Sequence, residues 1–270
     1  MATLLSERLG QAVVVENRPG GNTLIGGQAV ATAPRDGYTL LFVGGASLSS
    51  VFNRSPPFDM WTALTPVAPL YQGSYFLFTS AQLPVRTSQE FIAHARANPG
   101  KLNYGASGPG TMLAMEAFKA AAGLDITYIP YKGSSQVSAA LASNEIQALF
   151  DAMASNRALL QAGKVKLVAA AASKRAADAP DTPTLAEAGY PSIAAGFNGG
   201  VWAPAGTPRA VIDRLNRELA QVRQSPQFAE RVRAAGAEPV SGSPEDFGRI
   251  IRSELDFWRQ AAAKANFQPE

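Results

Sequence analysis

One segment, residues 104–133, limits the folds open to this chain, because it joins helix and strand signals in a fixed order. It reads as a glycine-rich loop, a helix at 112–122, a strand at 126–129 and a second loop that opens another helix. Gly123 directly follows the first helix and reaches the left-handed conformation that ends helices at little cost. Strands that alternate with helices are typical of sheets with helices packed on their faces.

The rest of the chain continues this alternation. Strands are predicted at 13–15, 39–43, 67–70, 75–79, 147–150, 165–172 and 197–203. Helices are predicted at 1–9, 24–33, 89–98, 136–143, 209–224, 227–235 and 244–265, with short helical turns near 59–64 and 184–189. The near-continuous apolar run at 165–172 indicates a strand covered on both faces. The pattern predicts an α/β protein.

Composition excludes several classes of function. Apolar residues make up 46% of the 270 residues, which is enough for a sizeable core, and the net charge is only +3 with no long basic run, so no nucleic-acid partner is expected. The absence of cysteine excludes disulfides and thiol catalysis, and a single histidine argues against a zinc or copper site. No apolar run reaches the roughly 18 residues of a membrane span. We expect no cofactor and no metal.

The glycine-rich loop has the chemistry of an anion site. Gly105, Gly108 and Gly110 carry no Cβ, so a ligand can approach the backbone closely. Thr111 is the predicted N-cap of the helix, whose free amides and positive dipole end favour a carboxylate or a phosphate. Ser134 or Ser135 is expected to cap the next helix in the same way. A plain strand-to-helix turn is the alternative reading of this loop.

The loop does not match the more specific motifs for nucleotide binding or for nucleophilic catalysis. The glycines do not follow the dinucleotide order G-x-G-x-x-G, and the strand after the helix ends in Pro130, where no acid can hold a ribose. No P-loop motif occurs. Ser107 does not fit a nucleophile elbow, because Pro109 stands where that motif needs glycine and His94 lies upstream of the serine. No catalytic residue is therefore assigned.

Two further strand ends carry candidate ligand contacts. Gly45, Ala46 and Ser47 follow the strand 39–43, where ligands gather in open α/β sheets, although a tight turn explains them equally well. Asp151 stands at the carboxyl end of the strand 147–150. It suits an acceptor for an amine or hydroxyl of a ligand, and it suits a helix cap for the segment that follows. Both roles stay open on the sequence alone.

Several motifs along the whole chain resemble one family. They are Val15-Glu16-Asn17-Arg18-Pro19-Gly20-Gly21-Asn22, Pro34-Arg35-Asp36-Gly37-Tyr38-Thr39, Tyr104-Gly105-Ala106-Ser107-Gly108 with Thr111, Pro130-Tyr131-Lys132-Gly133, Pro183-Thr184-Leu185-Ala186-Glu187-Ala188-Gly189 and Ala203-Pro204-Ala205-Gly206-Thr207-Pro208. Together they look like the Bug family of solute receptors, which serve tripartite tricarboxylate transporters. The motifs are far more specific in combination than singly.

The resemblance implies a type II periplasmic binding protein, or Venus flytrap, with two α/β lobes, each a central mixed sheet flanked by helices. Lobe 1 would hold residues 1–77 and 197–270, and lobe 2 residues 78–196, with the ligand cleft between them. Two crossings, near 76–80 and 196–201, would form the hinge.

The implied function is capture of a small organic carboxylate without chemistry, as a monomer that delivers its solute to the membrane subunits of a secondary transporter. The solute would be a dicarboxylate, a tricarboxylate, an amino acid or an aromatic acid. The residues expected to line the site are Gly20, Gly21, Asn22, Gly45, Ala46, Ser47, Ser80, Ser107, Gly108, Thr111, Lys132, Gly133, Ser134 and Asp151.

The N-terminus departs from the family pattern. In the resembling family the helix 1–9 is preceded by a strand, a glycine-rich ligand loop and an export signal, and residues 1–9 show no apolar signal segment. We expect an N-terminally shortened chain, a mis-set start or a natural variant. The location is periplasmic by resemblance, and cytoplasmic if Met1 is the natural start.

Three alternatives differ in class. The first is an α/β enzyme acting on an organic acid, for which the sequence offers only carboxylates as catalytic base. The second is a ligand-sensing partner of a membrane receptor, which would share the fold and the pocket. The third is a non-binding fragment, which the missing first strand motivates.

Overall fold

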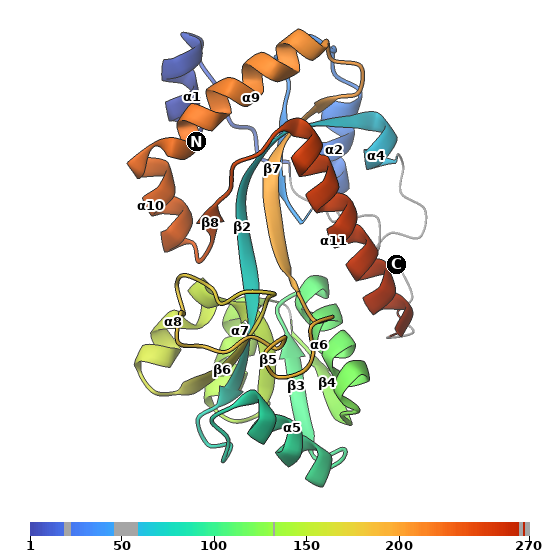
Figure 1. Ribbon diagram of the computed structural model, residues 1–270, viewed down its shortest axis with the longest axis vertical. Coiled ribbons are helices and arrows are strands. Elements are labelled where there is room, and N and C mark those ends of the chain that lie inside the picture. The colour runs from blue at the N-terminus through green and yellow to red at the C-terminus, as the bar shows by residue number, and fades with distance from the viewer. Residues whose placement is uncertain (19–22, 46–58, 132, 265–266, 268–270) are drawn as a thin grey trace. The chain divides into compact units, whose positions relative to one another are not determined.

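The computed structural model describes residues 1–18, 23–45, 59–131, 133–264 and 267. The chain forms two compact units, which are described separately (Figure 1). Unit 1 comprises Met1–Gln72 and Phe197–Trp258, and unit 2 comprises Gly73–Gly196 and Arg259–Phe267. None of the helices in the described part of the chain combines the length and the apolar character that a membrane span requires.

Unit 1 is an antiparallel sheet with helices around it. Its helices are α1 (Ala2–Leu9), α2 (Leu24–Ala31), α4 (Met60–Ala63), α9 (Arg209–Gln224), α10 (Pro226–Ala234) and most of α11 (Pro244–Lys264). Its strands are β1 (Leu41–Gly44), the first part of β2 (Leu64–Ser80), β7 (Gly196–Pro204) and the short β8 (Glu238–Pro239). The strand order is β1-β7-β2, with Leu41 opposite Trp202, and β8 pairs with β2 at Tyr71 and Gln72.

Apolar stripes on two long helices form the core of unit 1. On α9 the buried residues Ile212, Leu215 and Leu219 recur at helical spacing and join a cluster with Leu70 and Val201 of the sheet. The last helix, α11, carries a second such stripe, because Phe247, Ile251, Leu255 and Trp258 are buried and recur at helical spacing.

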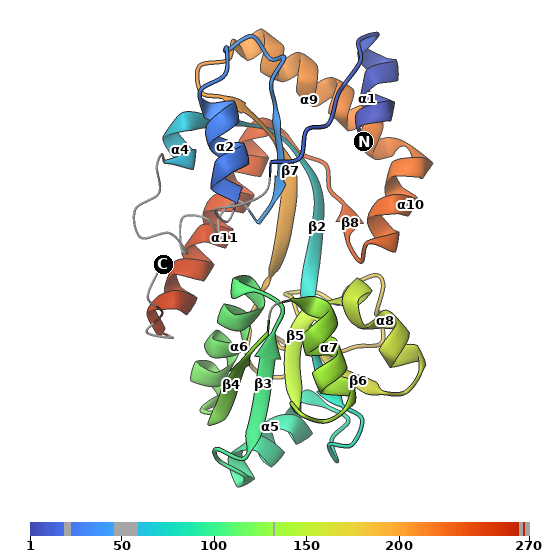
Figure 2. The ribbon, with the colours of Figure 1, turned by 180° about the vertical axis from the view of Figure 1, so that it is seen from behind.

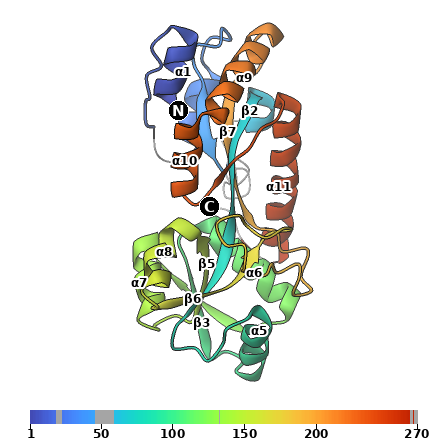
Figure 3. The ribbon, with the colours of Figure 1, turned by 60° about the vertical axis from the view of Figure 1, so that its left-hand side comes forward.

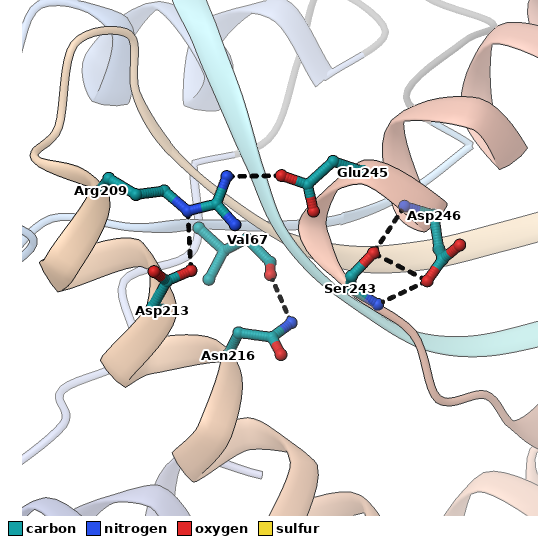
Figure 4. A network of polar contacts seen from close by, with 7 residues as sticks. All are labelled: Val67, Arg209, Asp213, Asn216, Ser243, Glu245 and Asp246. Atoms are coloured by element: carbon teal, nitrogen blue, oxygen red, sulfur yellow. Dashed lines mark hydrogen bonds and ion pairs between the residues drawn. The ribbon is translucent and has the colours of Figure 1, made fainter.

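A polar network holds the start of α11 and fixes α9 to the sheet (Figure 4). The Ser243 hydroxyl accepts a bond from the Asp246 amide at 3.0 Å, while the Asp246 carboxylate accepts from the Ser243 amide at 2.9 Å. This reciprocal capping box satisfies donors that a helix start leaves without partners. Nearby, Asn216 of α9 donates to the Val67 carbonyl of β2 at 2.8 Å, so α9 is also bonded to the sheet through polar groups.

Unit 2 is a mixed five-stranded sheet. Its strands are the second part of β2, β3 (Leu102–Ala106), β4 (Ile126–Pro130), β5 (Ala148–Ala152) and β6 (Val165–Ala171). The order is β6-β2-β5-β3-β4, in which β3 is parallel to β4 and β5, and β2 is antiparallel to β5 and β6. Its helices are α5 (Ser88–Ala97), α6 (Pro109–Ala122), α7 (Ser134–Ala142) and α8 (Met153–Gln161) (Figure 2).

The strand β3 lies between β5 and β4 and separates α6 from α7, because successive side chains on a strand point to opposite faces. The Tyr104 hydroxyl donates to Glu116 of α6. At the next residue, Gly105, a Cβ would lie 2.5 Å from Val137 Cγ2 of α7. The two helices therefore cover opposite faces of β3, and α7 approaches it where the strand has no side chain.

Most of the predicted elements are confirmed, two are wrong, and two predicted strands are parts of one strand. Residues 13–15 form no strand, and Val14 and Val15 are 86% and 66% exposed, so their apolar character reflects no burial. The strands predicted at 67–70 and 75–79 are one strand, β2, which is continuous through the polar turn signals between them (Figure 3). The short helix expected near 184–189 is a series of turns, tied to the sheet by a bridge between Ala170 and Thr184.

Replacing Ser243 by alanine is expected to lower the free energy of unfolding by about 1 kcal/mol, the usual cost of losing an N-cap side chain. The Asp246 amide would lose its acceptor. Urea unfolding of the purified variant measures the change. The matched control is Ser241→Ala, since Ser241 is exposed two residues earlier, and an equal loss in both variants would contradict the capping role.

Candidate functional site

The carboxyl edge of the parallel strands in unit 2 brings three loops together. Ala106, the last residue of β3, lies opposite Pro130 of β4 on one side and Phe150 of β5 on the other. The residues that follow, Ser107, Tyr131 and Asp151, therefore stand next to one another along this edge. The helices α6, α7 and α8 all begin within a few residues of it. We call this group of loops the strand-end site.

The loop into α6 is held by Thr111, but not in the way the sequence predicted. Gly108 is the N-cap and Thr111 lies inside the first turn, where its Oγ1 accepts from the amides of Ser107 at 3.1 Å and Gly108 at 3.2 Å. The same hydroxyl donates to the Gly108 carbonyl at 2.9 Å. The predicted capping role is wrong in position, because the Thr111 hydroxyl folds back on the loop before the helix and accepts from loop amides, not from those of the first turn.

The first amides of α6 point out of the helix end. The first intrahelical bond runs from the Met112 amide to the Gly108 carbonyl at 3.1 Å. The amides of Gly110 and Thr111 precede it and have no intrahelical acceptor, and Pro109 has no N–H to contribute. Together with the helix dipole they favour an anion at this end.

The loop into α7 repeats this arrangement on the neighbouring strand. Gly133 is the N-cap, so the prediction that Ser134 or Ser135 caps the helix is wrong; Ser134 is instead the first helical residue. The Val137 amide makes the first intrahelical bond, to the Gly133 carbonyl at 3.3 Å. A glycine N-cap offers no side-chain acceptor, which leaves the first-turn amides to other partners.

The glycines of these loops divide into two kinds. A Cβ at Gly108 or at Gly133 would meet no atom of the described residues within 4 Å, so neither backbone is covered by that part of the chain. A Cβ at Gly105 would instead clash with Val137, Ile146 and Tyr131. The expectation that a ligand approaches the backbone at Gly105 is therefore wrong, because side chains of α7 and its neighbours occupy that space.

Asp151 is a buried acid at this edge, with an exposed fraction of 4%. Its Oδ1 accepts from the Ala152 amide at 2.8 Å, and its Oδ2 is buried without a well-formed hydrogen bond among the described residues. The N-cap of α8 is Ala152, which has no side-chain cap bond, so the alternative role of Asp151 as a helix cap is not what the structure shows. An acceptor without a donor is costly inside a protein.

Burial raises the pKa of the Asp151 carboxyl above its ordinary value. The Ala152 amide and the hydroxyls of Ser107 and Ser155 act in the opposite direction, without cancelling the effect of burial. Ser155 is a residue that the sequence analysis missed. Its signal is its place four residues after Asp151, across the junction between β5 and α8.

Tyr131, the neighbour of Ser107 along the edge, is bonded elsewhere. Its hydroxyl donates to Glu145 Oε1 at 2.9 Å. Burial and this carboxylate raise the pKa of Tyr131 to about 12, so the phenol stays protonated at neutral pH. It supports the loop before α7 and is not assigned as a ligand contact.

Only some of the predicted site residues lie in the strand-end site. They are Ser107, Gly108, Thr111 and Asp151, with Gly133 and Ser134 on the adjoining loop. Ser80 ends β2, which is antiparallel to β5, so it lies at the opposite edge of the sheet; it is fully buried, and its hydroxyl accepts from the Gln82 amide. The predicted residues Gly20, Gly21, Asn22, Ala46, Ser47 and Lys132 lie outside the described residues.

Two described residues of unit 1 flank the predicted loops there. The Gly45 amide donates to the Asn198 carbonyl at 2.9 Å, so it is already paired within the unit. Thr23 is the N-cap of α2 but makes no side-chain cap bond. It has a left-handed backbone with φ 76, and its buried Oγ1 has no partner among the described residues. Such strain in a β-branched residue is typical of functional positions.

The strand-end site is suited to binding. It presents helix-terminal amides, hydroxyls and one buried carboxylate, and the described residues include no group of three His, Cys, Asp or Glu side chains placed to hold a metal. In α/β proteins, helix termini at the carboxyl ends of parallel strands are a usual place for small ligands to bind, so the arrangement is that of a small-ligand site.

Comparisons with known proteins give the family. Residues 1–267 match the family described as "Tripartite tricarboxylate transporter family receptor". The chain therefore belongs to this family of receptors, which confirms the resemblance seen in the motifs. BugT of Bordetella pertussis is 32% identical over 270-odd aligned positions, or 98% of this chain and 84% of BugT.

Solved structures of similar proteins support the same family assignment. The chain resembles Rpa4515 of R. palustris with adipate, at 33% identity and a TM-score of 0.84 over 100% of this chain and 91% of the other. It resembles the periplasmic binding protein BugD at 28% identity and a TM-score of 0.80, covering 100% and 92% of the two chains. MatC of Rhodopseudomonas palustris with bound malate is 25% identical, with a TM-score of 0.78 over 96% and 91%.

These likenesses confirm the predicted fold class, an α/β periplasmic binding protein with a mixed sheet flanked by helices. The mixed sheet is that of unit 2, whereas the sheet of unit 1 is antiparallel. The family and fold are those of periplasmic solute-binding receptors and not of enzymes. The lobe boundaries and the site residues expected from the sequence stay predictions.

Replacing Gly105 by alanine is expected to destabilise the protein by about 1–3 kcal/mol, the usual cost of overpacking. The new methyl would force apart β3 and α7, since its position lies 2.5 Å from Val137 Cγ2. Chemical denaturation measures the change. Gly133→Ala is the control and should cost less than about 1 kcal/mol; equal losses would contradict the packing role of Gly105.

Replacing Asp151 by asparagine is expected to raise the stability of the ligand-free protein at pH 7. The folded-state pKa of Asp151 lies above its unfolded-state value, so its ionised form destabilises the fold at every pH above the folded pKa. This penalty falls as the pH drops through the folded pKa, so the advantage of the variant should shrink on acidification. Urea unfolding at pH 7 and at lower pH tests both statements. A variant less stable than the parent at pH 7 would contradict them, and Asp125→Asn, at an exposed position, is the charge-matched control.

Proposed function

We propose that this chain is an extracytoplasmic receptor that captures a small organic carboxylate and delivers it to the membrane subunits of a tripartite tricarboxylate-type transporter. The observation that carries the proposal is the pair of glycine-capped helix starts, α6 and α7, on adjacent parallel strands. At the cap, neither backbone is covered by the described residues. Two amide clusters at one edge suit the two oxygens of a carboxylate.

The proposed contacts follow from this geometry. The amides of Gly110 and Thr111 would bind one carboxylate, with the Ser107 hydroxyl beside them, and the loop of Gly133 and Ser134 would bind from the adjoining strand. Gly108 matters for its missing side chain, because any Cβ there would occupy the approach. The loops of unit 1 that contain Gly20, Gly21, Asn22, Gly45, Ala46 and Ser47, together with Lys132, complete the proposed set.

Relatives support a carboxylate over the other anions that helix termini accept. Structures of this family hold adipate in one case and malate in another. The two acids differ in length and in substitution, while each has a carboxylate at both ends. The shared feature is therefore the carboxylate terminus, and we propose the same feature for the solute of this chain. Three parts of the proposal rest on the family alone: lobe closure, a periplasmic location and a monomeric state.

The direct test is thermal unfolding of the purified chain with a panel of mono-, di- and tricarboxylates, and with inorganic phosphate as the anion control. A carboxylate at about 100 times its Kd should stabilise the fold by roughly 2.7 kcal/mol. For a protein of this size the melting temperature should rise by several degrees. A cooperative transition that no carboxylate moves, or that only phosphate moves, would refute the proposal.

A substitution in the loop before α7 tests whether the carboxylate binds at the strand-end site. Gly133→Val is expected to abolish the carboxylate-induced rise, since the added side chain projects into the space in front of the α7 amides. Ala121→Val places the same final side chain at an exposed position in the last turn of α6 and should keep the full rise. Equal responses of the two variants would argue against binding at the strand-end site.

A further inference from the structure

The buried Asp151 carboxylate has a feature that the proposed anion site does not explain. Only one of its oxygens has a well-formed hydrogen bond, the one from the Ala152 amide at 2.8 Å. Among the described residues, the groups that act on this carboxylate are that amide and the hydroxyls of Ser107 and Ser155, and none of them is a cation. The Ser107 and Ser155 hydroxyls reach this carboxylate only through hydrogen bonds of poor geometry, so Oδ2 keeps capacity for a further donor at 4% exposure.

Asp151 lies directly beside the anion-binding end of α6. The parallel pairing of Ala106 with Phe150 puts Ser107 next to Asp151 along the sheet edge. Ser107 is also part of the α6 start, because its amide donates to Thr111 Oγ1 at 3.1 Å and its hydroxyl lies 3.3 Å from the same oxygen. One residue thus connects the buried acid with the helix terminus.

This juxtaposition is unfavourable for a plain carboxylate. The helix end attracts an anion, while the neighbouring Asp151 carboxylate repels it in a site of low dielectric constant. A solute that brings a hydrogen-bond donor beside its own carboxylate removes the conflict. The donor satisfies Oδ2 of Asp151, and an ammonium group also neutralises its charge.

We propose that the solute carries an ammonium or hydroxyl group on the carbon next to the carboxylate bound at α6, and that Asp151 accepts a hydrogen bond from it. This inference rests on the proposed carboxylate capture and adds its specificity. The solute class is therefore 2-amino or 2-hydroxy acids rather than unsubstituted aliphatic acids. Asp151 selects the substituent, and the helix-terminal amides select the carboxylate.

The test compares matched acids that differ only at the second carbon: succinate, malate and aspartate, and the five-carbon series glutarate, 2-hydroxyglutarate and glutamate. Isothermal titration gives the Kd of each for the parent chain. In the series that binds, at least one substituted acid should bind roughly tenfold or more tightly than the plain acid, as expected for a hydrogen bond to a charged group. The amino acid should exceed the hydroxy acid if Asp151 is ionised in the complex.

Asp151→Asn is the decisive variant, because it keeps the shape and removes the charge. The substituted acids should bind more weakly, and the plain acid more tightly since its repulsion is gone, so the order of affinities should reverse. Asp125→Asn removes the same charge at an exposed position before β4 and should keep the parent order.

The outcomes separate the two proposals. If plain acids bind as tightly as substituted ones, or if Asp151→Asn weakens all acids equally, Asp151 selects no substituent and this inference is wrong while carboxylate capture stands. If the folded chain binds no carboxylate of either series or of the wider panel, the proposed function itself fails. A reversal of preference in Asp151→Asn alone supports both.

Discussion

The site in unit 2 depends on one close contact, the approach of α7 to β3 at Gly105. A side chain there would meet Val137, Ile146 and Tyr131, so only glycine lets the helix lie against the strand. The approach sets the height of α7 above the sheet, and with it the position of the Gly133 amide loop relative to Ser107 and Gly108. Ordinary core packing thus places the helix terminus, as is usual where rigid elements carry a binding site.

The carboxyl edge of this sheet is less well satisfied than the rest of the unit. The core below it is made of buried aromatic and aliphatic side chains, such as Phe118 against Phe150 with ring centroids 5.9 Å apart. At the edge, Asp151 keeps an oxygen without a well-formed hydrogen bond, and the glycine caps leave amides without side-chain partners. Proteins tolerate such local cost at functional sites because the surrounding core compensates for it.

The sequence predicted the elements of unit 2 well and the details of its helix starts poorly. Periodic apolar residues and Gly123 located α6 and the strand after it, because these signals are local. The N-caps were assigned to Thr111 and to Ser134 or Ser135, since hydroxyl residues usually cap helices, whereas glycines do so here. Which glycine faces a helix and which faces open space depends on neighbours distant in sequence, so Gly105 could not be told from Gly108 by spacing. Ser80 was misplaced for the same reason, because strand direction decides which edge it joins.

The backbone amides and the Asp151 side chain of the strand-end site differ in how readily a substitution alters them. Carboxylate recognition rests on backbone amides, whose positions follow from the helix and strand geometry and which any sequence that keeps the fold will present. The neighbouring Asp151 is a side chain, so one substitution alters it while leaving the amides in place. A receptor built in this way keeps its class of solute as long as it keeps its fold, and changes its preference within that class through residue 151. The adipate and the malate in two family structures share their terminal carboxylates and differ in length and substitution, which is the pattern that a fixed set of backbone amides with exchangeable side chains around it would produce.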